Sequence, residues 1–294
     1  MSSTSTDPSY SAISNINFTG GFPTSADLAP SIVFLVLYVL VTPLLLWRWA
    51  RKSDRTLILI RPTIFHTCRI AMLAIRAYMS KNTYGEGLLI AELVLVSIGF
   101  LFLIEPVVAC WKLQIDSYLS EEDRPTWVRR LALLLKFTVL AAIGTAIAGS
   151  ALISNAIKNP DQLNTVKHLR QASNVLSFGA VTVVAIAAIL TWRRFTLDTR
   201  GTAFIVLTSA CLIVVAVYRM VQTFSTNSSA PVRSRAAFWG LQMVFEFLAF
   251  ILILSISIPT WFPGQKGRIA RNGLDEEMSP TSRSGHNGPA KANA

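Results

Sequence analysis

Charged side chains are scarce in this sequence, and most of those present lie between seven long apolar segments. Asp, Glu, Lys and Arg make up 15% of the 294 residues, against about 25% in an ordinary soluble domain. A soluble helix needs a polar face at helical spacing. Each apolar segment has about 20 residues, enough to cross a hydrocarbon core at about 1.5 Å of rise per residue. The segments lie near residues 30–47, 56–79, 88–110, 131–154, 172–192, 202–224 and 236–258.

These segments predict an all-α fold, a polytopic membrane protein with a seven-transmembrane-helix bundle over residues 28–261. The flanking segments, 1–27 and 262–294, are rich in small and polar residues. They bury too little apolar surface to offset the entropy lost on ordering, so we expect both to be disordered. The longest connection between spans runs only from 111 to 130, which leaves no room for a soluble catalytic domain.

Lysine and arginine are absent before Arg48, and this absence predicts the orientation. The connections on the side of the C-terminal tail, with the tail, carry 16 Lys and Arg residues, whereas the other side carries 6. The positive-inside rule therefore predicts an extracellular N-terminus and a cytosolic C-terminus. Two glycosylation sequons, at Asn17 and Asn227, fall on the predicted external side. Because the charge of +11 is spread over membrane connections, no nucleic-acid partner is expected.

Cysteine, histidine and lysine are too few in the spans for several known chemistries. The three cysteines (Cys68, Cys110 and Cys211) all lie within spans, which excludes a disulfide framework in the external loops. His66 is the only histidine in a span, so the sequence predicts no metal site and no cofactor. The seventh span has no lysine to form a retinal Schiff base.

Two further absences argue against the common class of heptahelical receptors. The cytosolic end of the third span reads Trp111-Lys112-Leu113-Gln114, where that class has an Asp-Arg-Tyr triplet. The seventh span ends Ile258-Pro259-Thr260-Trp261, without an Asn-Pro-x-x-Tyr motif. Since no pairing of nucleophile and base is evident either, an intramembrane enzyme is the least favoured function.

The fourth span is crowded with small residues between Ala141 and Ala151. Small side chains allow close backbone approach between helices in lipid. We therefore expect this span near the centre of the bundle.

Ionisable residues inside the spans are the candidates for function, because charge in the membrane is costly. The second span carries Arg61, Arg69 and Arg76, which share one helical face at about 100° per residue, with His66 on its flank. Such a stripe must face the bundle interior or a polar cavity. The other spans supply partners or further polar groups, namely Glu92, Glu105, Arg219, Gln222, Gln242 and Glu246.

Depth in the membrane predicts two pairs toward the ends of the spans. Arg76 and Glu92 lie roughly 10 Å to the external side of the midplane, and Arg61 and Glu105 roughly 10 Å to the cytosolic side. Glu92 and Glu105 project about 140° apart on their helix, so one of them could pair with a different helix. A second interpretation is that Arg61, Arg76, Glu92 and Arg219 extend to the membrane interface.

Arg69 and Glu246 both fall near the midplane, and this central pair is the best candidate for a polar binding site. Arg219 and Gln222 would lie at its external mouth, and His66 beside it. Two interpretations stay open for the central pair: a structural ion pair, or a ligand or transport site. His66 is either a satisfied polar core residue or a proton carrier.

Parts of the second half of the chain resemble the fungal seven-helix family of lipid-translocating exporters linked to aminocholesterol resistance. The similar motifs there are Tyr218-Arg219, Glu246 within the seventh span, and the ending Phe262-Pro263-Gly264; the proline segment 105–111 of the third span is similar to that family as well. Gln222 stands where that family has an acid, and a second acid of the seventh helix has no counterpart near Trp239. A related, uncharacterised fungal heptahelical branch is the alternative relationship.

The resemblance implies a role in lipid or sterol asymmetry and in resistance to toxic amphiphiles. We therefore expect a non-enzymatic integral membrane protein that handles membrane lipids or amphiphilic small molecules. The expected location is the plasma membrane or another membrane of the secretory pathway. The alternative is a heptahelical, receptor-like sensor that signals through its cytosolic tail.

Overall fold

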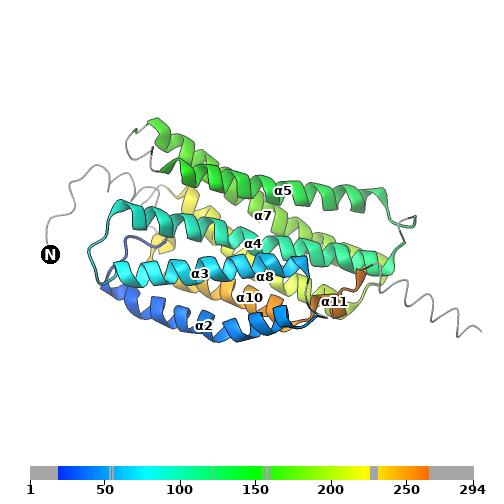
Figure 1. Ribbon diagram of the computed structural model, residues 1–294. Helices are drawn as coiled ribbons and strands as arrows, with labels where there is room; N and C mark the ends of the chain where they lie inside the picture. Colours follow the sequence, from blue (N-terminus) through cyan, green and yellow to red (C-terminus); the bar gives the residue numbers. More distant parts are fainter. Residues whose placement is uncertain are drawn as a thin grey trace, which may run out of the picture.

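Seven helices long and apolar enough to cross a membrane form a bundle in the computed structural model (Figure 1), which confirms the predicted all-α, seven-helix membrane fold. The structure describes residues 19–52, 54, 56–120, 122–153, 155, 159, 161–225 and 231–264. The long helices are α2 (Leu28–Ala50), α3 (Ile60–Met79), α4 (Glu86–Tyr118), α5 (Thr126–Ala151), α7 (Asp161–Phe195), α8 (Thr199–Phe224) and α10 (Val244–Ser255). The short helices are η1 (Ser25–Asp27), η2 (Leu57–Leu59), η3 (Pro231–Arg233), α9 (Arg235–Ala237) and α11 (Ile258–Trp261). A π-helix, η4 (Phe238–Met243), joins α9 to α10, so the seventh span is continuous from residue 235 to 255.

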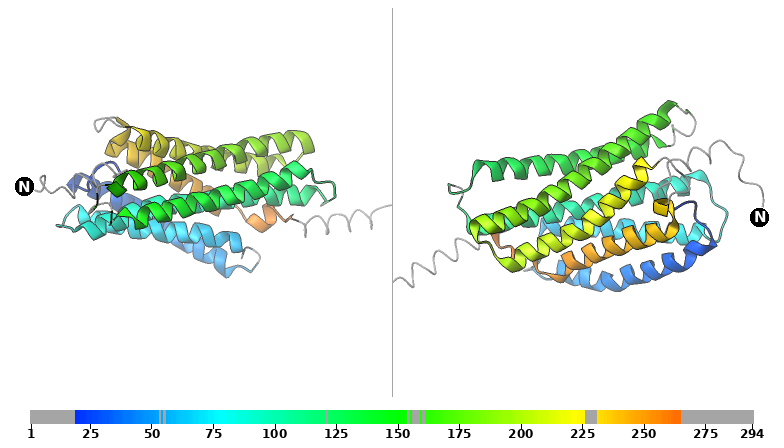
Figure 2. Two further views of the ribbon diagram at one scale, coloured as in Figure 1. Left: turned by 90° about the horizontal axis from the view of Figure 1, so that it is seen from above. Right: turned by 180° about the vertical axis from the view of Figure 1, so that it is seen from behind.

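The helices alternate in direction and lie side by side, so the bundle has two distinct ends (Figures 1 and 2). We call the end at which α2 begins the N-terminal end, and the end at which α2 stops the C-terminal end. Helices α4 and α8 are the most buried and α2 and α5 the least. Helix α4 contacts α3, α5, α7, α8 and α10, which makes it the central element of the bundle.

The first and the last spans contact each other through side chains at several levels and close the bundle. The rings of Phe34 and Trp239 stack with their centroids 5.6 Å apart. Near the C-terminal end, Arg48 Nη2 donates a hydrogen bond to the Leu254 carbonyl at 2.9 Å. The Ser257 hydroxyl, just after α10, donates to the carboxylate of Asp54 in the first connection.

The position expected for the fourth span is wrong, because α5 lies at the edge of the bundle. Helix α5 packs against α7 and α4, and two of its small residues, Ala142 and Gly149, lie directly against α7. A Cβ built on Gly149 would lie 3.4 Å from the Leu169 Cβ, and Ser173 Oγ donates to the Ala142 carbonyl at 2.9 Å. Small side chains therefore predicted close helix packing correctly but did not identify which helices lie inside.

Both predicted domain boundaries fall inside the folded part of the chain. Thr19 and Asp27 are fully buried, although we expected residues 1–27 to be disordered. Phe262 is buried as well, and the Gly264 amide donates to Ser117 Oγ at 2.8 Å. These contacts are made by polar groups and by a single aromatic ring, which hydropathy along the sequence does not reveal. Residues 1–18 and 265–294 lie outside the described part of the chain.

Two helices extend well past the apolar segments that predicted them. Helix α7 begins at Asp161, whereas its apolar segment begins near 172, and α4 continues to Tyr118 beyond the predicted end near 110. With 35 and 33 residues, these helices are about 50 Å long, longer than a hydrocarbon core of about 30 Å. The apolar segments therefore marked the lipid-embedded portions of these helices, and their polar ends continue beyond.

Two glycines of α5 provide a matched test of its packing against α7. Replacing Gly149 by Leu should lower the stability by about 1–3 kcal/mol, because the new side chain would overpack against Leu169. Gly144 has no atom within 4 Å of a built Cβ, so Gly144→Leu should leave the stability nearly unchanged. The thermal unfolding midpoints of the two purified variants in detergent provide the comparison. Equal midpoints would contradict the observed packing.

Candidate functional site

Three arginines on one face of α3 form a ladder that runs along the bundle. We call Arg61, Arg69 and Arg76 the arginine ladder; their spacing of eight and seven residues separates them by about 12 and 10 Å along the helix axis. Each contacts a carboxylate from a neighbouring helix. The structure thus brings together all three pairs that depth in the membrane predicted.

The middle rung joins α3 to α10 through Arg69 and Glu246. The Arg69 Nη2 and Nε atoms lie 2.6 and 2.7 Å from Glu246 Oε2, and both side chains are fully buried. Arg69 also donates to the Leu95 carbonyl of α4 at 3.3 Å. The other carboxylate oxygen, Glu246 Oε1, accepts from Gln242 Nε2 at 3.2 Å. The rung therefore connects three helices through protein contacts alone.

A glycine and an aromatic ring enclose the Arg69 guanidinium. A Cβ built on Gly99 of α4 would lie 3.2 Å from Arg69 Nη1. The Phe65 ring lies on another side, with its centroid 5.1 Å from the guanidinium carbon. This close packing, together with full burial, favours a structural role for the middle rung over direct contact with a ligand.

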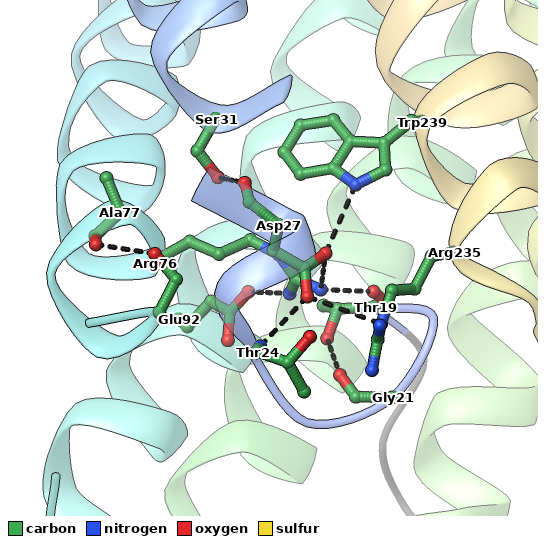
Figure 3. A network of polar contacts seen from close by, with 11 residues as sticks. Thr19, Gly21, Thr24, Asp27, Ser31, Arg76, Ala77, Glu92, Arg235 and Trp239 are labelled. Atoms are coloured by element: carbon green, nitrogen blue, oxygen red, sulfur yellow. Dashed lines mark hydrogen bonds and ion pairs between the residues drawn. The ribbon is translucent and has the colours of Figure 1, made fainter. Parts of the chain in front are cut away.

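The N-terminal rung is a larger network around Arg76, shown in Figure 3. Arg76 Nη1 contacts Glu92 of α4, while Nη2 lies 3.1 Å from Asp27 Oδ1 and donates to the Thr19 carbonyl at 2.9 Å. All three charged side chains are fully buried. The rings of Phe238 and Trp239 flank the guanidinium, with centroids 5.1 and 5.6 Å away.

Asp27 connects this network to the segment before α2 and to the start of the seventh span. Its carboxylate accepts from Trp239 Nε1 at 3.2 Å and from the Thr24 amide at 3.0 Å, and Arg235 Nε lies 3.3 Å away (Figure 3). Sequence reasoning missed Asp27 because it was placed in a disordered segment. A signal was present: Thr24-x-x-Asp27 directly before an apolar run has the spacing of a capping box.

The π-helix η4 supplies groups to two rungs of the ladder. Trp239 donates to Asp27 in the N-terminal network, and Gln242 donates to Glu246 in the middle rung. Single π-turns inside α-helices occur frequently at functional sites. Here the irregular turn delivers an indole and an amide to two different ion pairs.

The C-terminal rung, Arg61 and Glu105, is the accessible one. Arg61 Nε lies 2.9 Å from Glu105 Oε2, and the two side chains are 37% and 32% exposed. The pair borders a cavity of about 320 Å³ between the start of α3 and α4. The lining residues are Leu57, Ile58, Ile60, Arg61, Glu105, Pro106 and Ala109.

The difference in exposure follows from the geometry of α4. Glu92 and Glu105 are 13 residues apart, which places them about 140° apart around the helix. Glu92 therefore faces the bundle interior, whereas Glu105 lies on the flank of α4 and is reached by the long Arg61 side chain. Both glutamates pair with the same helix, even though they project in different directions.

The remaining predicted site residues are dispersed. His66 Nε2 lies 3.0 Å from Thr42 Oγ1, and its ring stacks on Phe250. Gln222 Nε2 donates to the Tyr218 hydroxyl at 3.1 Å. Arg219 Nη1 donates to the Ser97 carbonyl at 3.4 Å and lines a second, smaller cavity. These three side chains do not line one pocket with Arg69 and Glu246, although Arg219 is close enough to both to interact with them electrostatically. The two sequons, at Asn17 and Asn227, lie outside the described residues.

No protein-family model matches this chain, and no curated protein or solved structure is significantly similar to it. Within the described residues, no group of three or more His, Cys, Asp or Glu side chains is arranged to hold a metal ion.

A double substitution tests the structural role of the middle rung. Arg69→Met alone should destabilise the protein by about 3–5 kcal/mol, because it leaves Glu246 buried without its counter-charge. Adding Glu246→Leu should recover most of this loss, since apolar replacements of a buried pair are often neutral. The measurements are the thermal unfolding midpoint and the amount of membrane-inserted protein. A double variant no better than Arg69→Met would refute this role.

Two glycines of α4 test the space that Arg69 occupies. Gly87 has no atom within 4 Å of a built Cβ, so Gly87→Ala should stabilise the helix by up to about 1 kcal/mol. Gly99→Ala should instead destabilise by about 1–3 kcal/mol, because its methyl group would press on a guanidinium fixed by Glu246. Unfolding midpoints in the same detergent give the comparison, and a stabilising Gly99→Ala would show that Arg69 is free to move.

Proposed function

We propose that this integral membrane protein binds membrane lipids or amphiphilic small molecules and moves them or confers resistance to them, without catalysing a reaction. The observation that supports the proposal is the Arg61–Glu105 pair at the wall of an otherwise mainly apolar cavity. The resemblance of residues 105–111 and of Tyr218-Arg219 to the fungal lipid exporters agrees with a lipid ligand.

The cavity combines the two surfaces that an amphiphile requires. Leu57, Ile58 and Ile60 offer an apolar wall, while Arg61 and Glu105 offer one charge of each sign. Ligand pockets typically have volumes of about 300–1,000 Å³. A cavity of about 320 Å³ is at the small end of that range and suits a headgroup with the first part of a chain.

The exposure of the pair is what makes exchange with a ligand feasible. An ion pair facing acyl chains is poorly solvated, so a ligand that supplies its own charges can replace part of the lost hydration. A phosphate can pair with Arg61 and an amine with Glu105. The middle rung is fully buried, and its opening would require separation of α3 from α10.

The role of the ladder therefore differs from rung to rung. Our sequence-based hypothesis assigned ligand binding to Arg69 and Glu246; we now propose that Arg61 and Glu105 contact the ligand. Arg69 and Glu246 would fix α3 against α10, so that the cavity keeps its shape.

The charge asymmetry of the sequence supports a side of the membrane for the cavity. The connections on the side of the C-terminal tail, together with the tail itself, carry 16 Lys and Arg residues against 6 on the other side. By the positive-inside rule the C-terminal end would face the cytosol, so the cavity would take its ligand from the cytosolic leaflet. The plasma membrane or another membrane of the secretory pathway is the proposed location.

Transfer of labelled phospholipids and sphingoid bases by the full-length protein in reconstituted vesicles tests the proposal. Glu105→Gln removes one charge of the pair, and Ala109→Phe fills the cavity while keeping the pair intact. Both should slow transfer about tenfold if the cavity contributes about 1.4 kcal/mol to the passage. Glu122→Gln, on an exposed turn outside the cavity, is the matched control and should transfer at the normal rate.

Normal transfer by both cavity variants would eliminate the proposed site. Absence of transfer by the unaltered protein would favour the receptor-like alternative. Deletion of residues 265–294 separates the two functions: a translocator should retain its transfer rate, whereas a sensor that signals through the tail should lose its output.

A further inference from the structure

The face of α4 that borders the cavity at Arg61 and Glu105 continues past it toward the C-terminal end of the bundle. Between residues 102 and 116, the residues of α4 that are not buried recur at helical spacing: Phe102, Glu105, Ala109, Lys112, Leu113 and Asp116. Such spacing places them on one side of the helix. Glu105 and Ala109 line the cavity, so Lys112 follows them along the same face.

Lys112 is closely aligned with Glu105 along α4. The two residues are seven positions apart, which separates them by about 20° around the helix and about 10 Å along it. Since Glu105 is expected roughly 10 Å from the membrane midplane, Lys112 is expected roughly 20 Å from it. The hydrocarbon core ends about 15 Å from the midplane. Lys112 therefore falls at the level of the lipid headgroups, whereas the Arg61–Glu105 pair falls among the acyl chains.

The charge that Lys112 adds to this face is positive and exposed. The two carboxylates of the same face already have partners, since Glu105 lies 2.9 Å from Arg61 and Asp116 lies 2.7 Å from Arg124. Lys112 itself forms no ion pair within the part of the chain that the structure describes. A headgroup that approaches along this face therefore meets a positive charge first.

An apolar residue lies at a similar level on the opposite wall of the cavity. Helices α3 and α4 run in opposite directions (Figure 1), so Leu57, four residues before Arg61, lies on the same side of the Arg61–Glu105 pair as Lys112. Leu57 lines the cavity and is 83% exposed. The mouth of the cavity thus combines a cation with an apolar surface, the two features that an anionic amphiphile requires.

We propose that Lys112 is the outer of two cationic groups that receive a phosphate-bearing headgroup, so that the ligand of the cavity is an amphiphile with a phosphate group. The phosphate pairs first with Lys112 and then with Arg61, about 10 Å deeper along the same face. Lysine binds phosphate as a point charge, whereas it repels a ligand whose only charge is an amine. This inference rests on the proposed function, because it names the ligand class of the same cavity.

Two probes that differ only in a phosphate group test this inference. They are labelled sphingosine 1-phosphate and labelled sphingosine, which have the same chain and the same amine. Their transfer by the full-length protein is measured in reconstituted phosphatidylcholine vesicles. The unaltered protein should transfer the phosphorylated probe faster. Lys112→Gln should slow that probe about fivefold, the effect expected of one lysine near a membrane surface, and should leave sphingosine unchanged.

Three further substitutions separate the charge of Lys112 from its packing. Lys112→Arg keeps the charge and should preserve the transfer of both probes. Lys112→Glu reverses the charge and should reverse the preference, so that sphingosine is transferred faster. Arg193→Gln, which removes an exposed cation of α7 at the same end of the bundle, is the matched control and should leave both rates unchanged. Because residue 112 is exposed, its variants should unfold at the same temperature as the unaltered protein in detergent.

The results separate the role of Lys112 from the proposed function. Equal transfer of both probes by the unaltered protein would overturn the inference and leave the proposed function standing. The same holds if Lys112→Gln slows both probes equally, or if Lys112→Gln and Lys112→Glu transfer the phosphorylated probe at the normal rate. If the unaltered protein transfers neither probe and no labelled phospholipid, the proposed function fails and this inference fails with it.

Discussion

A guanidinium group held in the middle of a membrane bundle constrains everything around it. Arg69 is tolerated there because Glu246 neutralises it and because a backbone carbonyl of α4 accepts one of its N–H groups. Gly99 leaves the space for it, and Gln242 occupies the other carboxylate oxygen. Helices α3, α4 and α10 therefore have a common register that apolar packing alone would not specify.

The arginine ladder changes character along the length of α3. Toward the N-terminal end, Arg76 is enclosed by two carboxylates and two aromatic rings, and nothing is left exposed. Toward the C-terminal end, Arg61 has a single carboxylate and faces a cavity. The same residue type is thus fully enclosed at one end of the bundle and borders a cavity at the other. That asymmetry is the physical basis for the proposal that a ligand binds at the C-terminal end.

Much of this arrangement could be predicted from the sequence. Apolar segments of sufficient length determined the seven spans, and matching depths identified the partners of Arg61, Arg69 and Arg76. Depth in the membrane was informative because the position of a charged residue along its helix fixes its depth, so only residues at matching depths can pair. The direction in which a side chain projects around its helix was less informative. Glu105 projects about 140° away from Glu92, yet the long Arg61 side chain still reaches it.

Other features could not be predicted because they depend on contacts between distant segments. Asp27 lies just before an apolar run, and only the fold reveals that it faces Arg76 and Trp239. Arg170 precedes the apolar part of α7, so hydropathy assigned it to a connection although it lines a cavity. The small residues of α5 indicated close packing without specifying that the partners are α7 and α4.

The closure of the bundle by its first and last helices has a consequence for biosynthesis. Asp27 contacts Arg76, 49 residues later, and Trp239, 212 residues later. At about 5–20 residues per second, a ribosome needs roughly 10 to 40 s to proceed from the first of these residues to the last. During that interval the Asp27 carboxylate has Arg76 as a partner but lacks the indole of Trp239, and α2 packs against α3 before the last span is made. The contacts that close the bundle between its first and last spans therefore form only after the seventh span is made.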